Sequence, residues 1–232
     1  MGIHERKERE REHRREEILD AAQDVFFRKG LFPATMDEIA EKAELSKATL
    51  YLYYKSKEDL FLAVAMRGLE MLEESFHQVL GKALSPVLTL LQFIDALERF
   101  FEEDRNYFRL FAFIQTPQFH SVVSSEMRES CVAINHRIWT IATDVLRRGM
   151  KEGVVREDIN PSDVAIISMS TTTSLMFRID TELEKWKETM GIDLHRTLRL
   201  SNRLLLEAVL TDEGRRQLAQ EVALSGLQRL TQ

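Results

Sequence analysis

The segment SKATLYLYYKSKEDL, residues 46–60, concentrates phenol and ammonium groups in an otherwise acidic chain. It holds three of the chain's four tyrosines and three lysines, namely Tyr51, Tyr53, Tyr54, Lys47, Lys55 and Lys57. Hydroxyl and ammonium groups donate hydrogen bonds to phosphate oxygens, and lysine can also reach the acceptor atoms of guanine. From residue 42 to residue 57 there are four lysines against one carboxylate, that of Glu44. The segment therefore has the chemistry of a local nucleic-acid contact.

The charge of the whole chain excludes a protein that binds polyanions indiscriminately. The 232 residues carry a formal net charge of −6, and residues 1–60 hold 12 basic against 14 acidic side chains. A chain with this balance does not coat nucleic acid or an anionic membrane through its overall field. Any nucleic-acid contact must depend on where the lysines and tyrosines are placed.

Several features indicate a cytoplasmic protein with no membrane partner. The single cysteine, Cys131, excludes an internal disulfide and suits a reducing compartment. The chain is charged from His4 onward, unlike the apolar core of a signal peptide. The longest stretch without Asp, Glu, Lys, Arg or His, residues 164–177, is shorter than the roughly 20 apolar residues of a spanning helix. We expect it to form a buried helix.

The chain lacks the motifs that enzymes use. It contains no HExxH pair, no nucleophile elbow and no phosphate-binding loop, and its six histidines show no metal-ligand spacing. Adjacent acidic residues such as 102–104 are usually solvated or capping. We therefore expect a protein that is not an enzyme and that needs no catalytic residue, metal or cofactor.

A first helix is predicted in two parts. Residues 4–17, HERKEREREHRREE, hold six basic and six acidic side chains, His aside, with pairs such as Glu5 and Arg9 four residues apart. This spacing supports an exposed helix. An apolar helical stripe then runs from Ile18 to a cap near Gly30. The charged part is expected to be a solvated extension, with an arm that reaches nucleic acid as the alternative.

Two short helices after this one predict a helix-turn-helix. Thr35 stands three residues before Glu38, which is the capping-box spacing, and Ser46 can cap the next helix. With Leu45 and Leu50 toward the core, the second short helix would point Lys47, Ala48, Thr49, Tyr51 and Tyr53 outward. Such a helix enters the major groove of DNA. A fourth helix begins at Ser56, where backbone N–H groups beside Lys57 suit a phosphate.

The remaining sequence predicts more helices and no strand. Capping signals occur at Ser85-Pro86, Asn160-Pro161 and Asp193, a helix is expected from Asp104, and Pro117 should stop it. We therefore expect an all-α fold. Residues 1–60 would form a helix-turn-helix DNA-binding domain with its charged helical extension, and residues 61–232 a larger ligand-binding and dimerisation domain.

The run FPATMDEIAEKAELSKATLYLYYKSKEDLF resembles the DNA-binding domain of the tetracycline-repressor (TetR) family of bacterial transcription regulators. The likeness covers about residues 18–65. It implies an all-helical homodimer joined through its C-terminal helices. It also implies DNA-backbone contacts by Thr35, Thr49, Tyr51, Tyr53 and Lys57, base-edge contacts by Lys47 and Ala48, and a buried aromatic at Tyr54. Glu44 departs from the family, in which this turn position is often glycine, so the turn is either left-handed at some cost or built differently.

An apolar pocket is expected in the C-terminal part. Seven of the thirteen phenylalanines fall between residues 93 and 119, and pockets between bundled helices are mostly aromatic with a few polar groups. The alternative is ordinary core packing. The candidate ligand-binding residues are Phe101, Phe108, Phe111, His136, Trp139, Met169, Thr172 and Arg178.

These patterns favour a ligand-responsive regulator over two other classes. We expect a repressor that binds a palindromic double-stranded DNA operator and is released by a small, mostly apolar effector. The alternative is a helical protein-binding adaptor that keeps the fold without sequence-specific DNA binding. The third class, an enzyme, lacks any supporting motif.

Overall fold

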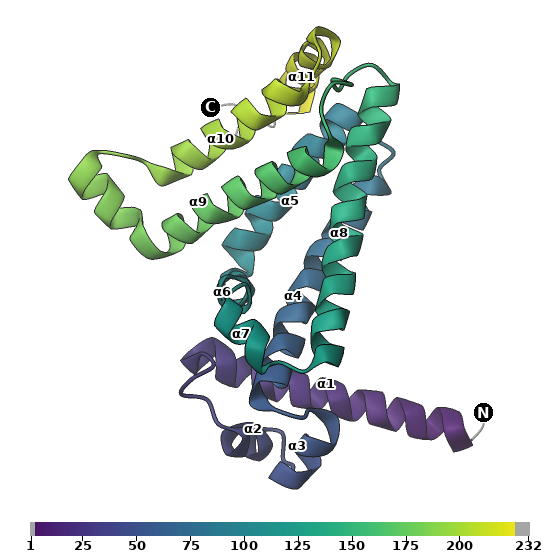
Figure 1. Cartoon of the computed structure of the whole chain (residues 1–232), viewed down its shortest axis with the longest axis vertical. Helices are drawn as coiled ribbons and strands as arrows, with labels where there is room; N and C mark the ends of the chain where they lie inside the picture. The colour runs from purple at the N-terminus through teal and green to yellow at the C-terminus, as the bar shows by residue number, and fades with distance from the viewer. Residues whose placement is uncertain (1–2, 226–232) are drawn as a thin grey trace. The chain divides into compact units, whose positions relative to one another are not determined.

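The computed structural model describes residues 3–225 as a series of helices (Figure 1). The helices are α1 (Ile3–Lys29), α2 (Met36–Lys42), α3 (Lys47–Tyr53), α4 (Lys57–Leu80), α5 (Pro86–Glu103), α6 (Arg105–Ile114), α7 (Pro117–Val122), α8 (Ser125–Lys151), α9 (Pro161–Met190), α10 (Leu194–Val209) and α11 (Asp212–Ser225). Extended pairing in the described range is limited to an isolated antiparallel bridge between Val155 and Leu210. The all-α expectation is confirmed.

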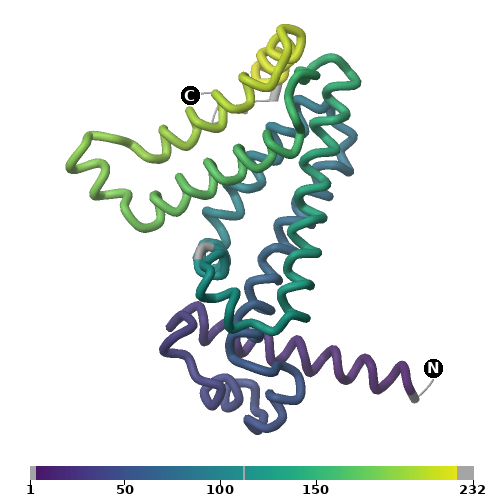
Figure 2. The backbone as a smooth tube through the Cα atoms, viewed as in Figure 1, coloured from purple at the N-terminus to yellow at the C-terminus, as the bar shows by residue number. Residues whose placement is uncertain are grey.

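The chain divides into two compact units, each built from two separate segments. Within the described residues, the first unit combines residues 3–70 with 106–134, and the second combines 71–105 with 135–225. In the colour scale of Figure 2, the two segments of the first unit are purple to blue and teal. Helices α4 and α8 each supply residues to both units, so the border is crossed more than once along the sequence.

Most helix starts follow the capping signals in the sequence. Thr35, Ser46, Ser85, Asn160 and Asp193 are all N-caps, and each side chain accepts a hydrogen bond from a backbone N–H of the first turn. Such a bond satisfies one of the donors that a helix start leaves unpaired. These predicted starts are confirmed.

Two expectations about the helices need correction. Pro117 does not simply stop a helix: α6 ends at Ile114, and Pro117 opens the short helix α7 with Thr116 as its N-cap. The uncharged stretch in α9 is not buried all round, because Ile166, Ile167 and Phe177 are about half exposed. Composition did not reveal that apolar side chains of this helix stay exposed among the described residues 3–225. No helix among residues 3–225 has the length and apolar character needed to cross a bilayer.

Phe61 of α4 is the centre of an aromatic cluster in the first unit. Its buried ring lies 5.0 Å from that of Phe26 in α1, measured between centroids, and 5.6 Å from those of Phe113 in α6 and Phe119 in α7. The rings of Phe26 and Phe113 meet it edge to face, which is a favoured geometry. This cluster fixes α4 against three other helices.

The close approach of α6 to α4 depends on Gly68. A Cβ atom at Gly68 would lie 2.7 Å from Cδ1 of the Tyr107 ring, well inside van der Waals contact. Tyr107 is held in place by its hydroxyl, which donates to Oε1 of Gln23 at 2.5 Å. Glycine is therefore needed at this crossing.

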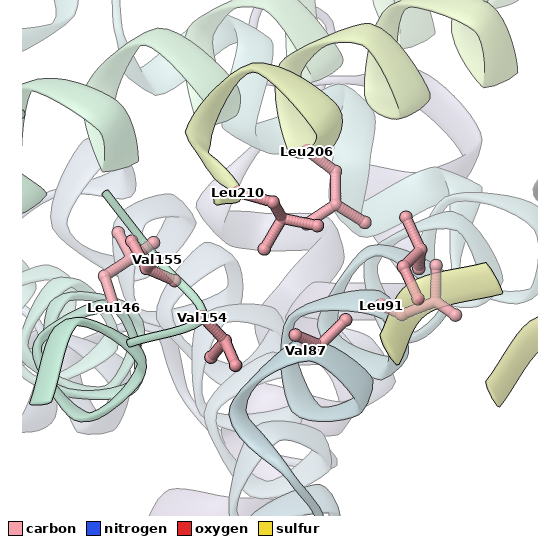
Figure 3. Packing of buried hydrophobic residues seen from close by; sticks show 8 residues of the cluster. Val87, Leu91, Leu146, Val154, Val155, Leu206 and Leu210 are labelled. Carbon is pink, nitrogen blue, oxygen red and sulfur yellow. The ribbon is translucent and has the colours of Figure 1, made fainter. Parts of the chain in front are cut away.

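The second unit contains a compact apolar core where the ends of four helices meet (Figure 3). Its buried members are Val87, Leu91, Leu146, Val154, Val155, Leu206, Leu210 and Leu218. Here the first turn of α11 lies against the backbone at Val154, whose carbonyl oxygen accepts from the Thr211 N–H at 3.1 Å. Gly214 fits because its missing side chain leaves room for that carbonyl group.

Candidate DNA-binding site

Helices α2 and α3 form the expected helix-turn-helix. Thr35 Oγ1 accepts from the Glu38 N–H while a Glu38 carboxylate oxygen accepts from the Thr35 N–H, so the capping box is complete. Ser46 Oγ accepts from the Thr49 N–H at 3.1 Å at the start of α3. The turn between the helices is closed by the Leu45 N–H, which donates to the Ala40 carbonyl oxygen at 2.9 Å.

Glu44 adopts the left-handed backbone conformation in this turn, with φ of 54°. A non-glycine residue at this position could either adopt the left-handed conformation or build the turn differently. Glu44 adopts the left-handed conformation. A side chain in that region costs about 1–2 kcal/mol relative to the right-handed region. The helix-turn-helix tolerates this strain because hydrogen bonds on both sides fix the turn.

Replacing Glu44 with glycine should relieve that strain. We expect Glu44→Gly to raise the free energy of unfolding by about 1 kcal/mol, measured by urea denaturation. The matched control is Glu41→Gly in α2, which should lower the same free energy by about 1 kcal/mol because glycine is unfavourable inside a helix. A loss of stability in both variants would contradict the strain at Glu44.

One face of α3 is buried and the opposite face is exposed. Leu50 is fully buried, whereas Tyr51 is 47% exposed. Lys47 and Ala48 are also exposed, and Thr49 and Tyr53 are half-buried at the edges of the outward face. The structure thus brings five of the predicted DNA contacts onto one short helix.

Leu52 is an exposed residue of α3 that the sequence reasoning missed. It is 80% exposed on a seven-residue helix, so the described residues 3–225 leave this large apolar side chain mostly uncovered. Helical spacing could have revealed it, because Leu52 is two residues from the buried Leu50 and so points away from the core. Its position suits contact with a thymine methyl group.

Tyr54 has the buried role expected for it. It is the C-cap of α3 and is 3% exposed, and its hydroxyl accepts from Nε of Arg15 at 3.2 Å. Burial raises the pKa of the Tyr54 phenol, although the Arg15 guanidinium opposes this. Tyr54 therefore connects α3 to α1 and is not a DNA contact.

Three lysines of the segment 42–57 are in ion pairs with carboxylates from other elements. Lys47 Nζ lies 2.8 Å from Oδ2 of Asp37 in α2, and the Asp37 carboxylate raises the pKa of the Lys47 ammonium. The other two pairs, Lys42 with Asp24 and Lys55 with Glu126, have distances of 2.8 and 3.0 Å. Exposed pairs of this kind exchange readily for another anion, because water screens them.

Lys57 and Thr35 lie at the ends of the helices that flank α3. Lys57 Nζ donates to the carbonyl oxygens of Ala34 at 2.8 Å and Phe32 at 3.3 Å, so it ties the start of α4 to the loop before α2. Ser56 Oγ accepts from the Asp59 N–H at 2.9 Å. This leaves the earlier N–H groups of α4 available for a phosphate.

The second unit contains a partly open cavity of about 120 Å³ lined by α5, α8, α9 and α10, with Phe76 of α4 at its wall. Trp139, Met169 and Thr172, three of the predicted ligand-binding residues, line it. The other five lie outside its lining. Phe101 is buried elsewhere in the second unit, Phe108 and Phe111 belong to the first unit, and His136 and Arg178 are exposed.

Asn202 is a polar wall residue of the cavity that the sequence reasoning missed. It is 5% exposed and occupies the apolar stripe of α10, four residues after Leu198 and four before Leu206. An asparagine in such a stripe signals a buried polar function, because it must find hydrogen-bond partners. Among residues 3–225, no group of three or more His, Cys, Asp or Glu side chains is placed to hold a metal ion.

Comparison with known proteins matches this geometry to one family. The model of the family described as "Bacterial regulatory proteins, tetR family" matches residues 18–64, which include α2, α3 and the start of α4. The HTH-type transcriptional activator FasR of Mycolicibacterium smegmatis is 37% identical over 100 residues, which cover 43% of this chain and 46% of FasR. The match thus spans less than half the length of that relative.

Solved structures share the fold over most of the chain. SmeT, the repressor of a Stenotrophomonas maltophilia multidrug efflux pump, has a TM-score of 0.62 and 22% identity, covering 85% of this chain and 91% of its own. FadR of Thermus thermophilus, a TetR-family repressor in complex with lauroyl-CoA, has a TM-score of 0.61 and 23% identity, covering 85% and 95%. Residues 18–64 therefore carry a helix-turn-helix that matches the TetR-family model, and most of the chain shares the fold of these solved structures.

Proposed function

We propose that this protein is a cytoplasmic transcription repressor that binds a palindromic DNA operator and leaves it when a small ligand occupies the second unit. The observation that carries the proposal is the outward face of α3, where Lys47, Ala48 and Tyr51 are exposed while Leu50 anchors the opposite face. A helix of this kind in a helix-turn-helix reads the major groove. FasR is named an activator and FadR a repressor, so the direction of regulation needs its own measurement.

The DNA contacts follow from exposure and chemistry. Lys47 and Ala48 would meet base edges, since both are exposed at the first turn of α3. Thr35, Thr49, Tyr51, Tyr53 and Lys57 would donate to backbone phosphates, Lys57 with the one ammonium hydrogen that is not used on the two loop carbonyls. We assign DNA binding to residues 1–60, and ligand binding and dimerisation to residues 61–232.

A homodimer would bring two copies of α3 onto one operator. The exposed apolar residues of α9 and α10 suit this interface, because an apolar surface gains free energy when it is covered. They include Ile166, Ile167, Phe177, Leu200 and Leu204. Two recognition helices must reach half-sites one helical turn, roughly 34 Å, apart.

The effector would occupy the cavity between α5, α8, α9 and α10. To reverse operator occupancy, a ligand must favour the released state by about 5 kcal/mol. The lining is mostly aliphatic and aromatic, which suits an apolar molecule. FadR binds lauroyl-CoA, which joins an apolar acyl chain to an anionic coenzyme A, so binding of an apolar chain would agree with this structural relative.

Selection of DNA from a random pool tests the function directly. We expect the purified protein to enrich a two-fold-symmetric site, and Tyr51→Ala to bind that site about tenfold more weakly by fluorescence anisotropy. Tyr51→Phe is the control that separates the ring from the hydroxyl, and affinity should fall with salt. If ligand-free protein enriches no sequence at low or high salt, the protein-binding adaptor becomes the better explanation.

Releasing Lys47 from its ion pair should strengthen DNA binding. Asp37→Asn removes the carboxylate that holds the Lys47 ammonium and also removes a negative charge near the phosphates. We expect affinity for the selected site to rise about threefold. The matched control, Asp24→Asn, frees Lys42, which is not among the proposed contacts, and should change affinity little. An equal gain in both variants would show a general charge effect.

A further inference from the structure

The polar groups of the cavity are few, and two of them are hydrogen-bonded to each other. Ser168, Thr172 and Asn202 line a wall that is otherwise apolar apart from the indole N–H of Trp139. The Thr172 hydroxyl donates to Oδ1 of Asn202 at 2.7 Å, and Nδ2 of Asn202 donates to Oε1 of Glu98 at 2.8 Å. Thr172 and Asn202 are both buried. The cavity wall therefore has one hydrogen-bonded polar pair, Thr172 and Asn202, which is connected to the Glu98 carboxylate.

The direction of donation along this chain of hydrogen bonds is fixed by its end. A carboxylate accepts, so the amide of Asn202 turns its Nδ2 toward Glu98 and its Oδ1 toward Thr172. Because Oδ1 can only accept, the single hydroxyl hydrogen of Thr172 is used on Asn202. Toward a ligand, the Thr172 oxygen can therefore offer lone pairs only. A ligand group that contacts it must supply a hydrogen.

The charge around the cavity disfavours an anion. All lining residues in the described part of the chain are uncharged, and Arg178, one of the candidate ligand-binding residues, pairs with Glu182 outside the lining at 3.1 Å. Behind Asn202, burial raises the pKa of the Glu98 carboxyl, which shows how poorly this region tolerates negative charge. A carboxylate ligand would lose part of its hydration there without a cation in the lining to compensate for it.

We propose that the cavity binds an uncharged, mostly apolar molecule that donates one hydroxyl hydrogen to Thr172, such as an aliphatic alcohol or a phenol. This inference rests on the proposed function, in which the cavity holds the effector. It adds the hydrogen-bonding group and the charge of the ligand to the apolar character that the lining indicates. A hydroxyl can also accept the second amide hydrogen of Asn202, but an ether can do the same. Donation of a hydrogen to Thr172 is therefore the property that distinguishes an alcohol from an ether.

The chain has a convenient reporter for this site. It contains two tryptophans, and Trp139 lines the cavity while Trp186 lies outside the lining. In Trp186→Phe, all tryptophan fluorescence comes from Trp139. Three probes of similar length can then be titrated: octanol, which donates and accepts, methyl heptyl ether, which only accepts, and octanoate, which is charged.

We expect octanol to change Trp139 fluorescence with an affinity about fivefold higher than that of the ether, the factor of one additional hydrogen bond. Octanoate should give no saturable change over the same range. Thr172→Val should remove the preference for the alcohol while leaving the ether affinity unchanged, and Thr172→Ser should keep the preference. Because serine keeps the hydroxyl, the Thr172→Ser result tests the inference even if the Thr172→Val protein does not fold.

Several results would overturn the inference. They are equal affinity for octanol and the ether, saturable binding of octanoate at similar concentrations, no response to octanol, or an unchanged alcohol preference in a folded Thr172→Val protein. Operator binding by the same preparation is measured without any probe. A protein that binds its operator but prefers octanoate would refute this ligand chemistry and leave the proposed regulator standing, whereas failure to bind DNA would refute the regulator.

Discussion

Gly214→Ala is expected to lower the free energy of unfolding by about 3 kcal/mol, through overpacking and the loss of a backbone hydrogen bond. The added Cβ would clash with the Val154 carbonyl group and lie 3.1 Å from Cδ2 of Leu210. Relief requires moving the backbone at Val154, which accepts from the Thr211 N–H. Thermal unfolding followed by circular dichroism should show a midpoint lower by roughly 6–12 °C.

Gly81→Ala is the matched control for this change. A Cβ at Gly81 would meet its nearest neighbours, the carbonyl oxygens of Gln78 and His77, at 3.6 Å, which is ordinary contact. We expect this variant to be as stable as the wild type or slightly more stable, because alanine restricts the unfolded chain. If Gly214→Ala behaved like Gly81→Ala, the contact between α11 and Val154 would not constrain the fold.

Phe61→Ala should destabilise the first unit by about 3–5 kcal/mol, the cost of removing a buried phenylalanine. The mutation removes the central ring of the aromatic cluster and leaves a cavity among α1, α4, α6 and α7. Since α4 follows α3 directly, we also expect loss of operator binding. Urea denaturation followed by circular dichroism measures the stability, and fluorescence anisotropy measures the binding.

Phe61→Leu is the control. It should lower the free energy of unfolding by about 1–1.5 kcal/mol and keep operator binding, because leucine retains most of the side-chain volume. Tryptophan fluorescence adds a second readout, since Trp139 and Trp186 both belong to the second unit. An early transition that is seen by circular dichroism but not by tryptophan fluorescence would place the damage in the first unit. Wild-type stability in Phe61→Ala would contradict the central role of this ring.

The helix starts could be predicted because their causes are local. A Thr35 hydroxyl and a Glu38 carboxylate three residues apart satisfy backbone donors within one turn, whatever the rest of the chain does. The same holds for Ser85 before Pro86 and Asn160 before Pro161. The extra helix α7 was missed because Pro117 both ends one helix and suits the first turn of another.

The lining of the cavity could not be predicted, because it depends on which helices face one another. Phe108 and Trp139 looked alike as aromatic residues on amphipathic helices, yet they belong to different units. Arg178 looked like a ligand contact at the end of an uncharged helix, but Glu182 is one turn further along and binds it. Asn202 could have been predicted from the sequence, because an asparagine within the apolar stripe of α10 indicates a buried side chain with hydrogen-bond partners.

The lysines near α3 have partners that are distant in sequence. Lys55 pairs with Glu126, 71 residues away, and Lys47 with Asp37, ten residues away. Residues 42–57 contain four lysines and one carboxylate in the sequence. In the fold, carboxylates of α1, α2 and α8 form ion pairs with three of these lysines. The tertiary structure therefore makes this surface less positive than its sequence suggests.

For the proposed regulator, this neutralised surface bears on how the protein searches a genome. A DNA-binding protein must distinguish its operator from about a million or more competing sites, and unspecific attraction to phosphate lengthens each stop at a wrong one. With Lys47 held by Asp37, random DNA meets little uncompensated charge on α3. Only a site that places a guanine where the carboxylate sits offers Lys47 a sequence-specific replacement partner, because phosphates are present in every sequence. The ion pair thus costs some affinity at the operator, but it shortens the stops at other sites more.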